Sequence, residues 1–268
     1  MPAPFTISPV PCVSKSELER SRFFRPFPLR YMVPNAVTAF SIVLACVGLV
    51  QAHMGQYSAA AWSIVWCALL DRIDGAVARF ANASSEFGRQ LDSLADFIAF
   101  CVAPGLIAYF LFTGAPRYSP LVAQPGFHTT LVSAVIVYIV AGGVRLARFN
   151  ITAATLRTGW YEGLTTTFSG LILVTFLLCG ERYSWSLEIM ASTPVVLIVC
   201  SVLMLSSLPL PKSLRPEQRG LFAFVAVSHV VVYVLGVSRS FPFVLLLFAL
   251  AYPLLGFFLG FRWSRQTP

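Results

Sequence analysis

Residues 71–96 read DRIDGAVARFANASSEFGRQLDSLAD and contain all four aspartates of the 268-residue chain. The aspartates form two pairs, Asp71 with Asp74 and Asp92 with Asp96, which a short polar connection separates. Long apolar runs lie on both sides of the stretch. The spacing predicts two successive antiparallel helices that bring the four carboxylates together where two membrane spans end.

The chain outside this stretch is strongly apolar. Its hydrophobic content is 57%, its charged content is 11% and its mean hydropathy is +0.77, values that are atypical of a soluble domain. Apolar runs recur that are long enough to cross a hydrocarbon layer about 30 Å thick. The predicted fold is therefore all-α, a polytopic membrane helix bundle. We expect eight spans, at approximately residues 33–53, 57–79, 91–113, 128–149, 163–180, 188–207, 219–236 and 240–261.

The arrangement of cations predicts the topology. Residues 33–262 are expected to form a single transmembrane domain, preceded by a basic juxtamembrane segment (1–32) and followed by a short cytoplasmic tail (263–268). With a cytoplasmic N-terminus, 16 of the 19 lysines and arginines lie on the cytoplasmic side. The three exceptions are Arg117, Arg182 and Arg239. The net charge of +8 then reflects topology and attraction to acidic lipid, and it gives no reason to expect a nucleic-acid partner.

Four carboxylates near the end of a span require compensation. They would repel one another and resist desolvation, and Arg72 and Arg79 cannot balance four negative charges. Divalent metal is the economical solution, and ligation by carboxylates alone favours Mg²⁺, Mn²⁺ or Ca²⁺ over zinc. Two ions about 4 Å apart could be bridged by such a set.

Small residues accompany the acids at helical spacing. Gly75, Ala78 and Gly88 leave room for a diphosphate beside the metals, and Arg79 could neutralise phosphate oxygens. Together these features predict a nucleotide diphosphate site. Two other interpretations are open: aspartates that only pair with arginines to hold helices together, and a cation-coupled membrane transporter, whose sites usually lie nearer the bilayer midplane.

The full pattern, D-x2-D-G-x2-A-R-x8-G-x3-D-x3-D, resembles the signature of the CDP-alcohol phosphotransferase family. The resemblance implies a core of six membrane helices, usually in a homodimer, and transfer of a phosphoalcohol from a CDP-linked donor with release of CMP. It also assigns roles by position. The implied metal ligands are Asp71, Asp74, Asp92 and Asp96; the implied CDP-site residues are Gly75, Ala78, Arg79 and Gly88. Asp96 would also act as general base.

Within the family, residues 32–150 most resemble the phosphatidylserine synthases. The similar segments include SSEFG at 84–88, LDSLAD at 91–96 and RLARFN at 145–150. This resemblance implies CDP-diacylglycerol and L-serine as substrates and a homodimer. Together with the carboxylate set, which predicts Mg²⁺ or Mn²⁺ in the form of two ions, and with the cation distribution, it predicts an active site that faces the cytoplasm. One segment departs from the pattern, because GLTTT at 163–167 stands where those enzymes commonly have Gly-Leu-Pro-x-Pro.

The acceptor site is expected at the end of the fourth predicted span. Arg145 and Arg148 are three residues apart and share a helix face, with Asn150 close behind. An arginine fork matches a carboxylate such as that of serine. Two arginines suit a phosphate equally well, so glycerol phosphate or inositol phosphate, and also choline, remain alternative acceptors.

Overall fold

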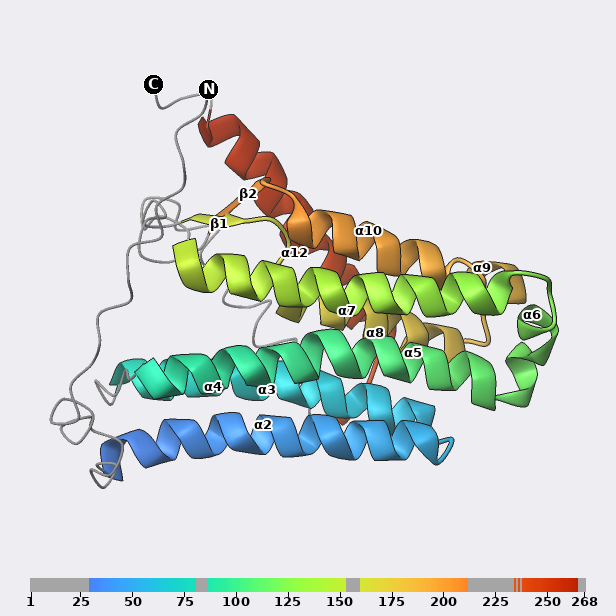
Figure 1. The fold of residues 1–268 in the computed structure, drawn as a ribbon, viewed down its shortest axis with the longest axis horizontal. Coiled ribbons are helices and arrows are strands. Elements are labelled where there is room, and N and C mark those ends of the chain that lie inside the picture. The colour runs from blue at the N-terminus through green and yellow to red at the C-terminus, as the bar shows by residue number, and fades with distance from the viewer. Residues whose placement is uncertain are drawn as a thin grey trace, which may run out of the picture.

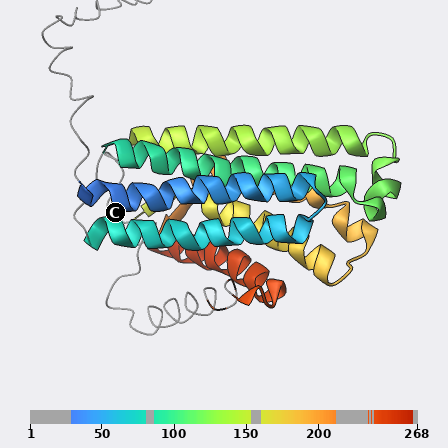
Figure 2. The same cartoon turned by 90° about the horizontal axis from the view of Figure 1, so that it is seen from below.

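A computed structural model describes residues 29–80, 86–152, 160–211 and 234–264, except residues 235 and 237. Some residues within these ranges, including 74–80, are described by their backbone alone. The long helices lie side by side in one bundle, and one end of this bundle brings together the first residues of α2 and α4 and the last residues of α3 and α7 (Figures 1 and 2). That end is called the site end below, and the opposite end the far end.

Most of the secondary-structure elements are helices. The helices are α2 (Leu29–His53), α3 (Tyr57–Phe80), α4 (Glu86–Phe97), the π-helical turn η1 (Ile98–Val102), α5 (Ala103–Gly114), the 3-10 turn η2 (Pro116–Tyr118), α6 (Ser119–Val122), α7 (Phe127–Thr152), α8 (Thr166–Arg182), α9 (Leu187–Met190), α10 (Thr193–Leu205) and α12 (Pro242–Ser264). Two short strands are β1 (Trp160–Glu162) and β2 (Pro209–Pro211). The segments α4, η1 and α5 follow one another as a single rod in Figure 1.

Four helical segments are long and apolar enough to cross a membrane. They are Asn35–His53, Glu86–Gly114, Phe127–Ile151 and Leu187–Leu205. These correspond to the first, third, fourth and sixth predicted spans, so an integral membrane protein built on a helix bundle is confirmed. Helices also occupy the second, fifth and eighth predicted positions, but the seventh, 219–236, lies largely outside the described residues. The number of eight spans stays a prediction.

The all-α fold class is confirmed, and the described residues add one small two-stranded sheet to the helices. Strands β1 and β2 pair antiparallel, with Tyr161 opposite Leu210. Pro209 and Pro211 are compatible with β2, because short edge strands tolerate residues without a backbone N–H. Gly163, with φ +70°, reverses the chain between β1 and α8, and its N–H donates to the Leu208 carbonyl at 2.8 Å. The sheet thus joins the start of α8 to the end of α10.

Helix α8 lies inside the bundle and contacts α3, α5, α10 and α12. Its residues are buried along almost the whole length, including the polar Thr166, Ser169 and Thr175. Thr165 caps its first turn by accepting a hydrogen bond from the Phe168 N–H at 3.4 Å. A buried helix of this kind fixes the position of the residues at its N-terminus, which lies at the site end.

Candidate active site

Three of the predicted carboxylates meet at the site end. One carboxylate oxygen from each of Asp71, Asp92 and Asp96 lies within 4.8 Å of the other two, and all three residues are half-buried. Asp71 belongs to α3, while Asp92 and Asp96 occupy successive turns on one face of α4. Two helices that follow each other in the chain therefore build one cluster, as the spacing predicted.

The cluster chemistry fits a divalent cation. Three carboxylates at this separation repel one another when ionised, and partial burial removes water that would otherwise screen them. A bound dication cancels this repulsion, and a donor set made only of carboxylate oxygens suits Mg²⁺ or Mn²⁺. The residues present are thus compatible with the metal site that the sequence predicts.

Other predicted residues of the site lie on the last turns of α3. Asp74, Gly75, Ala78 and Arg79 belong to this helix, which stays regular to Phe80. Helical geometry places the first three on the Asp71 side of α3. Their side chains lie outside the described part of the chain, so their roles stay predictions. Gly88, the remaining predicted residue, is half-buried one turn before Asp92 on α4.

The two predicted acceptor arginines have different surroundings. Arg145 is only 6% exposed, and its Nη1 lies 3.5 Å from the Thr166 hydroxyl oxygen at the start of α8. Arg148 donates from Nη1 to the Leu205 carbonyl and from Nη2 to the Ser206 carbonyl, both at 3.1 Å. These carbonyls lie at the C-terminal end of α10, where backbone acceptors lack helical partners. The Arg148 fork therefore holds the end of α10.

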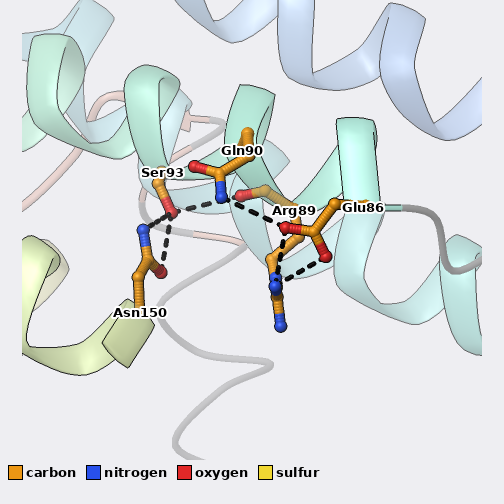
Figure 3. A network of polar contacts seen from close by, with 5 residues as sticks. All are labelled: Glu86, Arg89, Gln90, Ser93 and Asn150. Carbon is orange, nitrogen blue, oxygen red and sulfur yellow. Dashed lines mark hydrogen bonds and ion pairs between the residues drawn. The ribbon is translucent and has the colours of Figure 1, made fainter. Parts of the chain in front are cut away.

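Asn150 connects α7 to the helix that carries two of the aspartates. Its amide donates to the Ser93 hydroxyl at 3.1 Å, and Ser93 is the residue that follows Asp92 (Figure 3). Nearby on α4, Arg89 forms an exposed ion pair with Glu86 at 2.6 Å, a type of pair that contributes little to stability. Asn150 is thus placed to fix the position of α4.

Sequence reasoning missed the contacts of two residues at the site end: Ser93 is the partner of Asn150, and Thr166 is the partner of Arg145. Arg72, one of the two arginines of the aspartate segment, has its guanidinium 5.8 Å from the centre of the Phe168 ring. The only sequence signal was indirect: the GLTTT segment departs from the expected pattern at the position where Thr166 meets Arg145. Contacts between distant helices leave no local mark in the sequence.

Comparison with known proteins supports the family assignment. The sequence model of the CDP-alcohol phosphatidyltransferase family matches residues 31–207. Among curated relatives, a CDP-diacylglycerol–serine O-phosphatidyltransferase of Helicobacter pylori is 35% identical over 155 residues, which cover 57% of this chain and 60% of that protein. The match thus spans about three fifths of the relative's length.

Two further relatives carry the same name. The protein from Saccharomyces cerevisiae is 33% identical over 145 residues, covering 53% of this chain and 48% of its own length. The protein from Methanocaldococcus jannaschii is 29% identical over 180 residues, covering 67% and 74%. The family match includes the whole carboxylate cluster as well as Arg145, Arg148 and Asn150. This chain belongs to the CDP-alcohol phosphatidyltransferase family.

Proposed function

We propose that this protein transfers the phosphatidyl group of CDP-diacylglycerol to L-serine and releases CMP. The carrying observation is the carboxylate cluster of Asp71, Asp92 and Asp96, which fits a metal-dependent diphosphate site. The choice of serine is supported by the names of the relatives from three distant organisms. We further propose that the active site faces the cytoplasm, in accord with the arrangement of cations.

In this proposal the aspartates hold one or two Mg²⁺ or Mn²⁺ ions, Asp74 completing the ligand set. When bound, the metal supplies positive charge to the diphosphate oxygens of the donor. Arg79 contributes a further cation, and Gly75, Ala78 and Gly88 leave space beside the backbone for the diphosphate. Because phosphoryl-type transfer requires mainly positioning and charge neutralisation, these residues provide most of what the reaction needs.

Asp96 acts as general base. The acceptor hydroxyl oxygen forms a bond to the phosphorus that carries diacylglycerol, and the bond from this phosphorus to the CMP oxygen breaks. The hydroxyl proton passes to the Asp96 carboxylate as the new bond forms, since a neutral hydroxyl is a poor nucleophile. Asp96 lies one helical turn after Asp92 along α4 and is therefore further from the site end of the bundle.

Arg145 recognises the acceptor. It is a buried cation at the site end, and a guanidinium pairs well with the serine carboxylate. Arg148 and Asn150 support the same pocket from α7, one by holding the end of α10 and the other by holding α4. A homodimer in the membrane completes the proposal, as the resemblance implies.

CMP release from purified protein in lipid nanodiscs tests the function. CDP-diacylglycerol and Mn²⁺ are supplied with L-serine, glycerol 3-phosphate, inositol, inositol phosphate or choline in separate reactions. We expect release with serine alone. Asp96→Asn removes the base and should be inactive, whereas Glu188→Gln changes an exposed acid on α9 at the far end and should retain activity.

Each outcome has a defined meaning. CMP release with another acceptor would support phosphatidyl transfer as the reaction and would overturn the assignment of serine as the acceptor. Absence of release with every acceptor, from protein whose unfolding transition is intact, overturns the enzymatic proposal. In that case uptake of a divalent cation into proteoliposomes tests the transporter alternative.

A further inference from the structure

The helix that carries Asp92 and Asp96 is interrupted by a π-helical turn. Residues Ile98–Val102 form η1, which begins two residues after Asp96, and the Ala103 N–H donates to the Ile98 carbonyl five residues earlier. Such turns are rare within α-helices and frequently occur at functional sites. In this chain the turn separates the aspartates of α4 from the apolar residues of α5.

The turn has a polar partner on another helix. The hydroxyl of Tyr138 on α7 donates a hydrogen bond to the Phe100 carbonyl at 2.7 Å, in the middle of η1. Tyr138 is fully buried, so the hydroxyl has no access to solvent. A side-chain donor inside the backbone ladder stabilises a local departure from α-helical geometry, because it satisfies a carbonyl that the irregular turn presents.

Two glycines allow neighbouring helices to approach this turn. A Cβ added at Gly142 of α7 would overlap the Sγ of Cys101, and one added at Gly170 of α8 would lie 3.0 Å from the Phe100 carbonyl oxygen. Gly142 lies one helical turn beyond Tyr138 on α7. The π turn is therefore packed closely between α7 and α8, with the Tyr138 hydrogen bond at its centre.

Contacts with α7 also fix the position of the carboxylates along the length of the bundle. Asn150 bonds to Ser93 at the site end, Gly143 lies close to the Phe97 ring, and Tyr138 bonds to Phe100 deeper in the bundle. Asp96 lies between the first and the last of these contacts. Helix α7 thus holds the α4–η1 segment on both sides of the proposed general base.

A π turn contains one residue more than an α-helical turn, so it changes the angular relation between the helices that it joins. One residue corresponds to a rotation of about 100° in an α-helix. If η1 relaxed to α-helical geometry, Asp92 and Asp96 would rotate relative to α5 by roughly this angle. Because α5 is fixed in the core, the carboxylates would turn away from Asp71.

From these observations we infer that Tyr138 is a positioning residue for the active site: its hydroxyl holds the π turn and thereby keeps Asp92 and Asp96 directed at Asp71. The inference deepens the proposed function, since it concerns the metal site of that reaction. Tyr138 does not touch the substrates in this scheme. Its effect is transmitted through the backbone of η1 to the carboxylates.

The test compares Tyr138→Phe with Tyr118→Phe in the full-length protein. Tyr118 is likewise fully buried and donates to the Glu181 carboxylate at 2.5 Å, but it lies at the far end of the bundle. Mn²⁺ binding is measured by electron paramagnetic resonance without substrates, and CMP release is measured as a function of Mn²⁺ concentration. Both substitutions remove one buried hydroxyl and leave the ring in place.

We expect Tyr138→Phe to raise the Mn²⁺ concentration for half-saturation by about threefold to tenfold, the cost of one lost buried hydrogen bond. Tyr118→Phe should lower the unfolding temperature without changing Mn²⁺ binding. Wild-type Mn²⁺ binding in Tyr138→Phe, together with a loss of thermal stability like that of Tyr118→Phe, would show that the hydroxyl contributes stability alone and would overturn the inference.

A second pair of variants covers the case in which Tyr138→Phe does not fold. Gly142→Ala forces α7 away from η1 at Cys101, whereas Gly180→Ala creates a similar overlap with the Met190 side chain at the far end. Weaker Mn²⁺ binding in Gly142→Ala alone supports the inference, and equal binding in both variants overturns it. Metal binding measured without substrates separates this result from the proposed reaction, because altered binding without CMP release would leave the positioning role intact and reject the function.

Discussion

The two ends of the bundle differ in the surroundings of their acidic groups. At the site end, three acidic side chains of like charge lie within 4.8 Å of one another. At the far end, polar groups meet complementary partners: Tyr118 donates to Glu181 at 2.5 Å, and Arg117 donates to the Trp185 carbonyl at 2.6 Å. The far-end contacts each pair a donor with an acceptor, whereas the site end brings carboxylates of like charge together, an arrangement that a bound cation would stabilise.

Burial of Tyr118 reinforces the contrast. Removal from water and the neighbouring Glu181 carboxylate both raise the pKa of the Tyr118 phenol, so it remains a neutral donor at any physiological pH. The far-end hydrogen bond therefore persists without a cofactor. At the site end the Asp71, Asp92 and Asp96 carboxylates lie close to groups of like charge, so a bound cation would favour their ionised forms.

Removal of metal should produce the largest effect, and it is the most direct test of the contrast between the two ends of the bundle. EDTA is expected to abolish CMP release, and Mn²⁺ or Mg²⁺ should restore it, because the proposed reaction needs a dication beside the donor diphosphate. Thermal unfolding provides a second readout: metal at about 100 times its dissociation constant should stabilise the protein by roughly 2.7 kcal/mol. Activity that persists in EDTA would contradict the metal assignment.

Substitution of Asp96, the proposed general base, should have the next largest effect. Asp96→Asn retains the size of the side chain but cannot accept the acceptor proton, so kcat is expected to fall by about 10² to 10⁴. Stopped assays of CMP formation at saturating serine measure this change, with Glu188→Gln as the control. A fall of less than tenfold would show that another group removes the proton.

Substitution of Arg145, the proposed acceptor-binding residue, should have an intermediate effect, and Arg148 provides the matched comparison. Arg145→Ala removes a charged hydrogen-bond donor, which is worth about 1.5 to 3 kcal/mol, so KM for serine should rise by roughly tenfold to a hundredfold. Arg148→Ala removes donors to the end of α10 and should lower the unfolding temperature more than it changes KM. The reverse pattern would exchange the roles of the two arginines.

Loss of a far-end hydrogen bond should give the smallest effect. Glu181→Gln leaves Tyr118 with a weaker, neutral acceptor, and the expected loss of stability is about 1 kcal/mol. The KM values and the Mn²⁺ response should equal those of the unaltered protein. Any change in Mn²⁺ response would mean that the two ends are coupled through the bundle, and the contrast between them would fail.

Much of the fold followed from local sequence patterns. Apolar runs of span length predicted α2, α7 and α10, because crossing a membrane demands length and hydrophobicity whatever the tertiary structure. The pairing of Asp71 with Asp92 and Asp96 was equally predictable, since i, i+4 spacing and a short connection bring carboxylates of successive helices together.

The remainder depends on contacts between segments distant in the chain. Nothing near Tyr138 indicates that its hydroxyl meets the Phe100 carbonyl, and nothing within Ile98–Val102 distinguishes a π turn from ordinary α-helix. The role of Arg148 was likewise not visible in the sequence. An arginine at this position is expected both from the excess of cations on the cytoplasmic side and from ligand binding, but its partners are the carbonyls at the end of α10. Only the packed structure separates such alternatives.

The π turn also bears on how the span between Glu86 and Gly114 can change in evolution. A continuous α-helix transmits any change of pitch or tilt from one end to the other. An irregular turn held by its own partners is a joint within the span, so a substitution that removes the turn would redirect the carboxylates of α4 relative to α5.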